Sequence, residues 1–277
     1  MGISTLPLSP IVDLVPRTVS PRPLSGGVRS QRAFKAGGAQ RRPMTKFVLI
    51  PGAWLGAWSW KEVAAELQAK GHSAYPVTLT GMGDRVHLAN KELGLEGAVQ
   101  DVLNVIKYNE LDDYVVVGHS FAGKVAAVVA DREHAKVKKV IYLDAFRPDK
   151  VSTPQGGFDP AREFGALPPG GFAHPLTEAT IDNIGKDVKG KTRAWLMAMS
   201  TPWPAKMAKD ELTLSKDYDW SKEAYVFCTL SGDPVDDIIA GKWGELHGPY
   251  KLIESGHWPM ITKPKETAKS LIALSKG

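Results

Sequence analysis

The feature of this sequence that most constrains its fold is a serine placed between a predicted strand and a predicted helix. Residues 114–117 form a strand-forming apolar run, and residues 124–130 favour a helix. Ser120 lies in the short turn between them. A turn of this kind holds a serine in a strained conformation that exposes its hydroxyl, and it needs small neighbours because adjacent backbone passes close by. Gly118 meets that need, whereas Ala122 stands where a second glycine is usual and departs from the pattern by one methyl group. Ser120 is therefore a candidate nucleophile.

The chain from residue 45 onward alternates strand and helix signals. Further short apolar runs predict strands at 46–50, 73–78, 139–143, 224–229 and 250–253, and apolar residues at helical spacing predict helices at 58–70, 99–106 and 265–274. Strands separated by helices of this length indicate a parallel sheet covered on both faces. A Pro- and Gly-rich stretch, 147–219, interrupts the alternation. The expected fold is α/β, a mostly parallel, doubly wound sheet with a small cap insertion at 147–219, all within one domain spanning 45–277.

The N-terminal residues 1–44 differ from this domain in composition. Of the 35 basic and 30 acidic residues in the chain, eight and one lie within residues 1–46, which leaves 27 and 29 for the rest. The formal charge of +5 therefore gives no support to nucleic-acid binding, because the body lacks a basic footprint. An Arg- and Ser-rich, acid-poor leader resembles an organelle transit peptide, and a plastid is the expected destination. The alternatives are a disordered tail or a start upstream of the working Met44, with the protein in the cytoplasm.

The sequence gives no indication of a membrane-spanning helix, a disulfide framework or a metal site. No apolar run approaches the roughly 20 residues that a membrane-spanning helix needs. The single cysteine, Cys228, excludes an internal disulfide framework and a cysteine-rich metal site. Because it falls in the predicted strand 224–229, a buried small side chain is expected there. No metal or organic cofactor is expected.

A serine nucleophile needs a base, and His257 is the candidate. It follows the predicted strand 250–253 and a Ser-Gly turn, and functional groups of open parallel sheets gather at the carboxyl ends of strands. Its place after Ser120 fits the order serine, acid, histidine that this layout uses. His119, next to Ser120, is expected to point away from the cleft and to act as a packing residue.

The group that orients the histidine has two candidates. Asp233 is the preferred one, because it comes nearest the end of strand 224–229, where Asp236 and Asp237 are more simply read as first-turn charges of a helix. Asp144, which ends the strand at 139–143, is the alternative.

An acyl-transfer site also needs hydrogen-bond donors for an oxyanion. The N–H of Phe121, directly after the serine, is one candidate. The loop after the first strand supplies the other, most simply the N–H of Ala53, with Gly52 and Trp54 beside it as further oxyanion or substrate-binding residues. Glycine in this loop allows close approach of the backbone to substrate.

Five motifs together resemble the α/β-hydrolase superfamily, and within it the branch of plant methylesterases, hydroxynitrile lyases and related bacterial esterases. They lie at 47–54, 71–72, 80–85, 118–123 and 255–257, and the likeness spans about residues 46–275. The resemblance implies Ser120 as nucleophile, His257 as base and the N–H groups of Ala53 and Phe121 as oxyanion donors. It also favours Asp233 as the acid.

The resemblance allows more than one activity. Ester hydrolysis proceeds through an acyl-enzyme. The related lyases use a Lys after the histidine and a Thr in the oxyanion loop, where this chain has Trp258 and Gly52, so a lyase is disfavoured. A small-molecule receptor of the same fold with slow or no turnover remains an alternative.

The substrate expected from the sequence is a small or medium carboxylic ester, a methyl ester among the candidates. Apolar residues of the cap are candidates to line its pocket or simply to pack the cap on the sheet. They are Phe158, Phe164, Phe172, Trp195, Met197, Met199 and Trp203. No further partner is indicated, and a homodimer is left open.

Overall fold

The structure is a computed structural model that describes residues 44–145, 151–152, 166–167, 169–242 and 245–276. Except for Met44, the predicted leader lies outside the described residues. The described residues belong to the unit formed by Arg41–Gly277.

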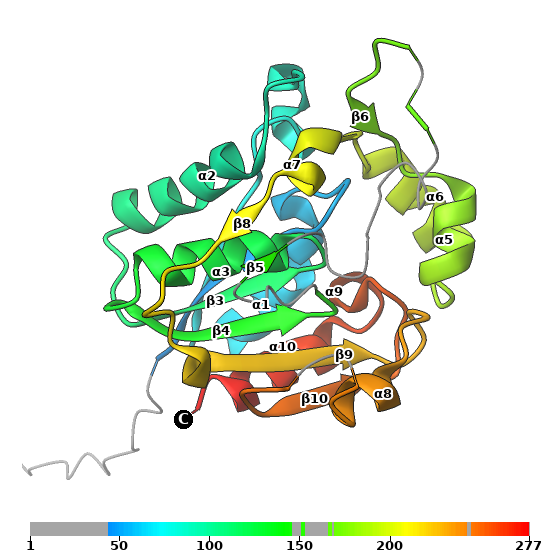
Figure 1. The fold of residues 1–277 in the computed structure, drawn as a ribbon. Coiled ribbons are helices and arrows are strands. Elements are labelled where there is room, and N and C mark those ends of the chain that lie inside the picture. The colour runs from blue at the N-terminus through cyan, green and yellow to red at the C-terminus, as the bar shows by residue number, and fades with distance from the viewer. Residues whose placement is uncertain (1–43, 146–150, 153–165, 168, 243–244, 277) are drawn as a thin grey trace, which may run out of the picture. The chain divides into compact units, whose positions relative to one another are not determined.

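A six-stranded sheet with the strand order β10-β9-β4-β3-β1-β2 forms the centre of this unit (Figure 1). Its strands are β1 (Lys46–Ile50), β2 (Ser73–Pro76), β3 (Tyr114–His119), β4 (Val137–Leu143), β9 (Glu223–Cys228) and β10 (Tyr250–Ile253). All five pairings between neighbours are parallel. The inner strands β3 and β9 are buried along their whole length, as expected for a parallel sheet covered on both faces. The prediction of a parallel α/β sheet is confirmed.

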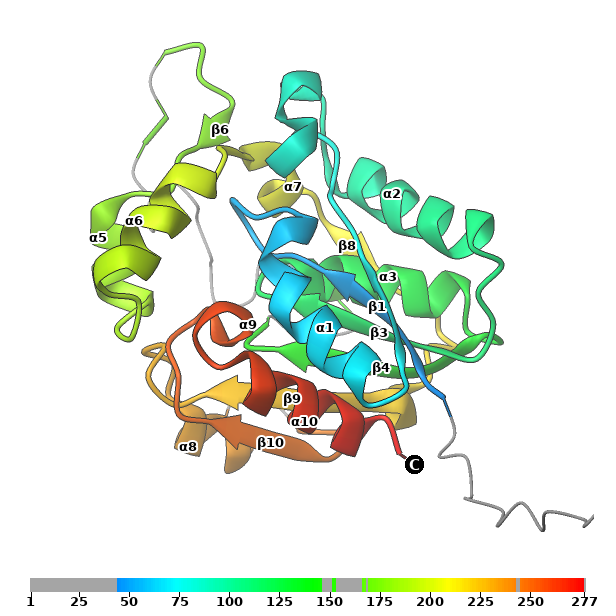
Figure 2. The same cartoon turned by 180° about the vertical axis from the view of Figure 1, so that it is seen from behind.

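Helices cover both faces of the sheet. Helices α2 (Leu95–Tyr108) and α3 (Ala122–Arg132) pack together on one face, and α1 (Lys61–Ala69) and α10 (Pro264–Leu274) pack together on the other (Figures 1 and 2). The short helix α9 (Pro259–Thr262) contacts α10. The predicted helix at 58–70 divides into a 3-10 turn, η1 (Ala57–Trp60), and α1.

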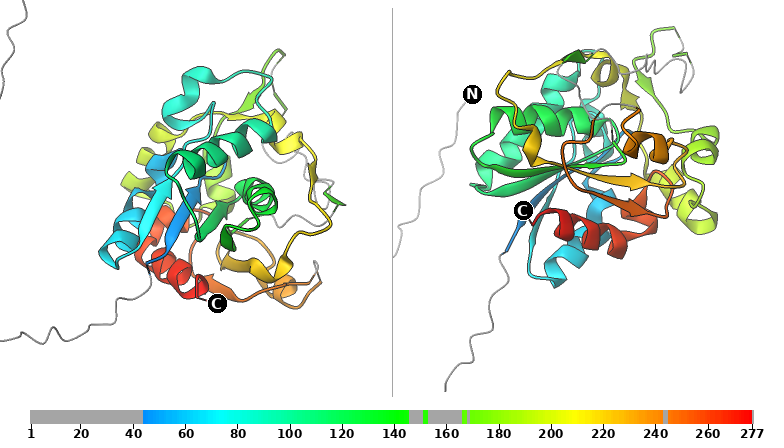
Figure 3. Two further views of the ribbon diagram at one scale, coloured as in Figure 1. Left: turned by 90° about the vertical axis from the view of Figure 1, so that its left-hand side faces the viewer. Right: turned by 60° about the horizontal axis from the view of Figure 1, so that its bottom comes forward.

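The described residues of the cap insertion form short helices and strands. They are β5 (Val151–Ser152), β6 (Ala173–His174), α5 (Glu178–Ile184), α6 (Gly190–Met199), β7 (Trp203–Pro204), α7 (Ala205–Lys209) and β8 (Leu212–Thr213). The pairs β5–β8 and β6–β7 are antiparallel. Helices α5 and α6 lie beyond the carboxyl ends of the strands, as Figure 1 and the right-hand view of Figure 3 show.

The connections outside the cap contribute three further short helices. They are η2 (Gly83–Leu88), η4 (Trp220–Lys222) and α8 (Val235–Ile239). Within the described part of the chain, no helix has the length and apolar composition needed to cross a bilayer.

Candidate active site

The turn between β3 and α3 has the geometry expected of a strained nucleophile. Ser120 directly follows β3 and has φ +57°, a conformation that side-chain-bearing residues rarely adopt. A Cβ at Gly118 would lie 2.5 Å from the Ala122 carbonyl oxygen and 2.8 Å from the Ala126 Cβ. Only glycine therefore fits at 118, whereas the methyl of Ala122 is accommodated in the buried core.

Three side chains from distant parts of the sequence form one hydrogen-bonded chain. The Nε2 of His257 lies 2.8 Å from the Ser120 Oγ, and its Nδ1 lies 2.6 Å from the Asp144 Oδ2. Because an ionised carboxylate only accepts hydrogen bonds, the Nδ1–H of His257 donates to Asp144. Nε2 is then free to accept from the serine hydroxyl, which is the arrangement that a general base requires.

The carboxylate that bonds to His257 in the structure is not the one preferred from the sequence. Asp144, the alternative candidate, bonds to His257, and Asp233 forms no hydrogen bond to that ring. Asp144 follows β4, the neighbour of β3 in the sheet, and its φ of +43° is again left-handed. Asp233 lies five residues beyond the end of β9 and is exposed. Partial desolvation, followed by the negative charge of Asp144, raises the pKa of Asp233, so that carboxyl lies near the site without bonding to the base.

The Asp144 carboxylate is buried, with 4% of the residue exposed, and both of its oxygens have partners. Oδ2 accepts from His257, while Oδ1 accepts the backbone N–H of Cys228 at 2.9 Å and lies 3.4 Å from the Ser231 hydroxyl. These donors stabilise the ionised form and fix its orientation. The Cys228 thiol is buried as predicted, and burial, followed by the charge of Asp144, raises its pKa.

Two backbone donors lie where the sequence predicted an oxyanion site. The N–H groups of Ala53 and Phe121 donate to no acceptor within the described residues. Phe121 directly follows Ser120. Gly52 brings the Ala53 loop against the serine, because a Cβ at 52 would lie 2.9 Å from the Ser120 Cβ. The two N–H groups are thus available to donate hydrogen bonds to an oxygen atom of a group bound next to Ser120.

Gly52→Ala is expected to lower kcat/KM for an ester about 100-fold, because the added Cβ would lie 2.5 Å from His119 Nδ1 and force the loop away from Ser120. Steady-state kinetics and thermal unfolding measure the effect. Gly97→Ala on α2 is the matched control: its Cβ meets only Leu93, at 3.9 Å. It should keep full activity and gain up to about 1 kcal/mol of stability. Equal activity of the two variants would contradict the prediction.

The alpha/beta hydrolase family model matches residues 47–270. The chain belongs to this family. A carbendazim hydrolyzing esterase from Nocardioides sp. (strain SG-4G) is 45% identical over 250 residues, which cover 83% of this chain and 100% of that protein. Methylesterase 10 of Arabidopsis thaliana is 25% identical over 84% of this chain and 92% of its own length. The chain is an ester-cleaving member of the family.

Solved structures agree with the fold. An extracellular alpha/beta-hydrolase from a Paenibacillus species superposes with a TM-score of 0.71 at 23% identity, covering 84% of this chain and 100% of that one. Polyneuridine aldehyde esterase gives a TM-score of 0.70 at 20% identity, covering 84% and 100%. The predicted superfamily is confirmed.

Trp54, which the sequence suggested as an oxyanion or substrate-binding residue, is buried in this alpha/beta hydrolase. Only 2% of it is exposed, and its φ is +68°. Its indole N–H donates to the His174 carbonyl in β6, its own carbonyl accepts from the Thr201 N–H, and its ring contacts Trp203. Trp54 thus connects the loop after β1 to the cap, which no local sequence signal indicated.

The residue after the histidine is also buried. Trp258 is fully enclosed and packs against Gly185, so closely that a Cβ at 185 would overlap its ring. No cation therefore lies at the position where the related lyases have lysine. In the described part of the chain, no group of three or more His, Cys, Asp or Glu side chains is arranged to hold a metal ion.

The apolar cap residues proposed as pocket-lining divide into four groups. Phe158 and Phe164 lie outside the described residues. Trp203 is buried against Trp54 and Phe121, whereas Phe172, Trp195 and Met199 are more than one third exposed, and Met197 is partly buried against the core. Packing of the cap accounts for Trp203, which contacts the loop after β1 through Trp54.

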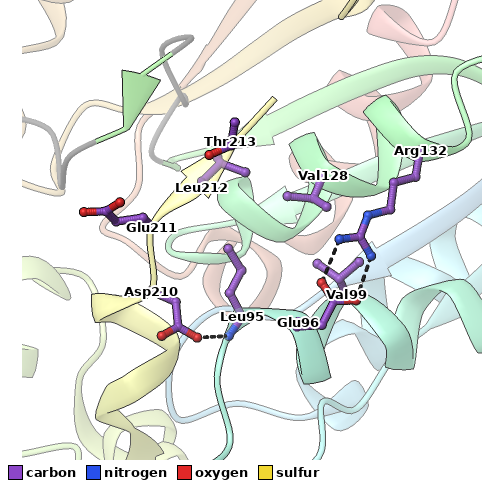
Figure 4. Close-up of a pocket in the computed structure, with 9 residues that line it drawn as sticks. All are labelled: Leu95, Glu96, Val99, Val128, Arg132, Asp210, Glu211, Leu212 and Thr213. Atoms are coloured by element: carbon purple, nitrogen blue, oxygen red, sulfur yellow. Dashed lines mark hydrogen bonds and ion pairs between the residues drawn. The ribbon is translucent and has the colours of Figure 1, made fainter. Parts of the chain in front are cut away.

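A pocket of about 430 Å³ lies between α2, α3 and the segment that enters β8 (Figure 4). Glu96 and Arg132 in its wall form a bidentate pair at 2.7 Å, and Asp210 accepts the Leu95 N–H. None of its lining residues belongs to the Ser120–His257–Asp144 chain. This pocket is therefore separate from the candidate active site.

Proposed function

We propose that this alpha/beta hydrolase cleaves carboxylic esters through an acyl-enzyme on Ser120. The observation that carries the proposal is the unbroken chain from the Ser120 hydroxyl through His257 to the buried Asp144 carboxylate. In this assignment, Ser120 is the nucleophile, His257 the general base, and Asp144 the group that holds the imidazole in its reactive tautomer.

Acylation begins when Ser120 Oγ attacks the ester carbonyl carbon as its proton passes to His257 Nε2. The carbonyl oxygen becomes an oxyanion, which accepts hydrogen bonds from the N–H groups of Ala53 and Phe121. When the carbon–oxygen bond to the alcohol breaks, His257 returns the proton to the departing oxygen. The acyl group then remains on Ser120.

Deacylation repeats these steps with water. His257 takes a proton from the water as its oxygen attacks the acyl carbon, and the proton is then delivered to Ser120 as the carboxylic acid leaves. Asp144 stays ionised throughout and stabilises the imidazolium that forms twice in the cycle.

We propose methyl esters as the substrate class, and carbendazim as the first compound to test. The supporting observation is that the relatives include a carbendazim hydrolyzing esterase at 45% identity and a plant methylesterase. A receptor without turnover is the alternative class. The hydrogen bonds that link Ser120, His257 and Asp144, and the two N–H groups without an acceptor among the described residues, support catalysis. A protein that only binds its ligand needs neither feature.

Two measurements on the wild-type protein test this function. A fluorophosphonate probe should label the folded chain at Ser120, located by peptide mass spectrometry. A panel of carbendazim and of methyl, ethyl and tert-butyl esters of one acid should show turnover that falls as the alcohol grows. Labelling without turnover of any ester would favour the receptor, and failure to label the folded protein would count against a serine nucleophile.

A further inference from the structure

The fully buried side chain of His119 contacts both the candidate base and the loop at Gly52. Its Nε2 lies 2.7 Å from the backbone carbonyl oxygen of His257, a residue 138 positions later. The two imidazole rings are 4.7 Å apart at 45°. On its other side, Nδ1 faces the place where a Cβ at Gly52 would be, at 2.5 Å.

The hydrogen-bonding partner fixes the protonation of His119. A carbonyl oxygen can only accept a hydrogen bond, so the Nε2 of His119 carries a proton and donates a hydrogen bond to the His257 carbonyl oxygen. Nδ1 is buried and has no hydrogen-bond partner among the described residues. Burial holds the pKa of His119 well below its usual range, and positive charge on His257 lowers it further, although the bond to the carbonyl opposes both. His119 is therefore the neutral Nε2–H tautomer.

This bond completes a set of restraints on the base. The backbone N–H of His257 donates to the Ile184 carbonyl at the end of α5, at 2.8 Å. Its carbonyl accepts from His119, and its ring bonds to Asp144 and Ser120. Ile184 belongs to the cap, whereas His119 is the last residue of β3 and adjoins Ser120. Among the hydrogen bonds of the described residues, only that from His119 connects the backbone of His257 to the strand that precedes Ser120.

We infer that His119 is a positioning residue. Its Nε2–H donates to the His257 carbonyl and so fixes the position of the His257 backbone relative to Ser120. The inference rests on the proposed function, because it assigns His119 a role in the same reaction. Removing the His119 donor leaves the His257 carbonyl without its hydrogen-bond partner, and the loop that carries His257 can then shift relative to Ser120. Displacements of about 1 Å at a reacting pair cost roughly 100-fold in rate.

A matched pair of substitutions tests this role. His119→Met and His119→Gln have similar size and flexibility, but only the glutamine amide can donate to the His257 carbonyl. We expect kcat for the best ester to fall about 10- to 100-fold in His119→Met with KM within about threefold, and to stay within about fivefold of wild type in His119→Gln. Thermal unfolding of both variants checks that they are folded.

Equal kcat in wild type and folded His119→Met would overturn the inference, as would an equal loss in the Met and Gln variants. A second measurement needs no substitution. In ¹⁵N-histidine NMR of the wild type, one imidazole should remain a neutral Nε2–H tautomer from about pH 5 to pH 8, and His119→Gln should remove that signal. A His119 that gains a proton in this range would also overturn it. The proposed function fails separately, if the wild type neither labels nor turns over esters.

Discussion

Ser120→Ala is expected to reduce kcat for ester hydrolysis by about 10⁴-fold or more, which is typical when the nucleophile of a serine hydrolase is removed. No other hydroxyl is hydrogen-bonded to His257 among the described residues, so the base would have no neighbouring group to activate. The fold should be unaffected, because the change removes one oxygen from a side chain that is already partly exposed. Initial rates with the best ester of the panel measure the loss, and fluorophosphonate labelling should disappear with it.

Ser221→Ala is the matched control for this variant. Ser221 is exposed in η4, where its hydroxyl bonds only to Asp219. The control should keep wild-type kcat and labelling. If Ser120→Ala retained more than a tenth of the wild-type rate in a preparation free of contaminating esterase, Ser120 could not be the nucleophile.

The turn that holds Ser120 between β3 and α3 could be predicted from the sequence because all the residues that form it are close together in the chain. A strand, a small residue, the serine and a helix follow one another within about 20 residues, and the close packing at Gly118 explains why the spacing is tight. The parallel sheet could be predicted for a similar reason: each strand is a short apolar run followed by a helix.

The acid could not be fixed in the same way. Asp144 and Asp233 both follow strands whose carboxyl ends meet at one edge of the sheet, so position along the chain does not separate them. In the structure, the backbone places the two carboxylates differently. Asp144 turns into the left-handed region directly after β4, whereas the turn after β9 has carried Asp233 to the surface. Aspartate adopts a positive φ more often than most residues do, but Asp144 and Asp233 share that preference, so it does not distinguish them.

The roles of His119 and Trp54 were missed because their partners are remote in sequence. His119 is buried, as expected for a packing residue, but the carbonyl that its side chain contacts belongs to a loop 138 residues later. Trp54 likewise bonds to His174, 120 residues away. Contacts of this kind depend on how the cap and the final loop close over the sheet, which local patterns do not encode.

Asp144→Asn is expected to lower kcat by about 10⁴-fold while the protein stays folded. The asparagine oxygen can still accept the Cys228 N–H, so its amide group would face His257 Nδ1. That nitrogen would then become an acceptor, and the proton would move to Nε2, where it blocks transfer from Ser120. The loss should appear in kcat rather than in KM, because the carboxylate does not contact substrate.

Asp233→Asn is the control that separates the two carboxylates, since the substitution is chemically identical and the residue lies near the same histidine without bonding to it. Its kcat should stay within about threefold of wild type, because it removes only a charge that acts through partly solvated space. Measuring both variants with one ester over pH 5 to 9 makes the comparison independent of the pH chosen. The opposite result would contradict the assignment: a loss of about 10⁴-fold in kcat for Asp233→Asn, with kcat of Asp144→Asn close to wild type. The acid would then be Asp233, and the hydrogen bond from His257 to Asp144 would not describe the working enzyme.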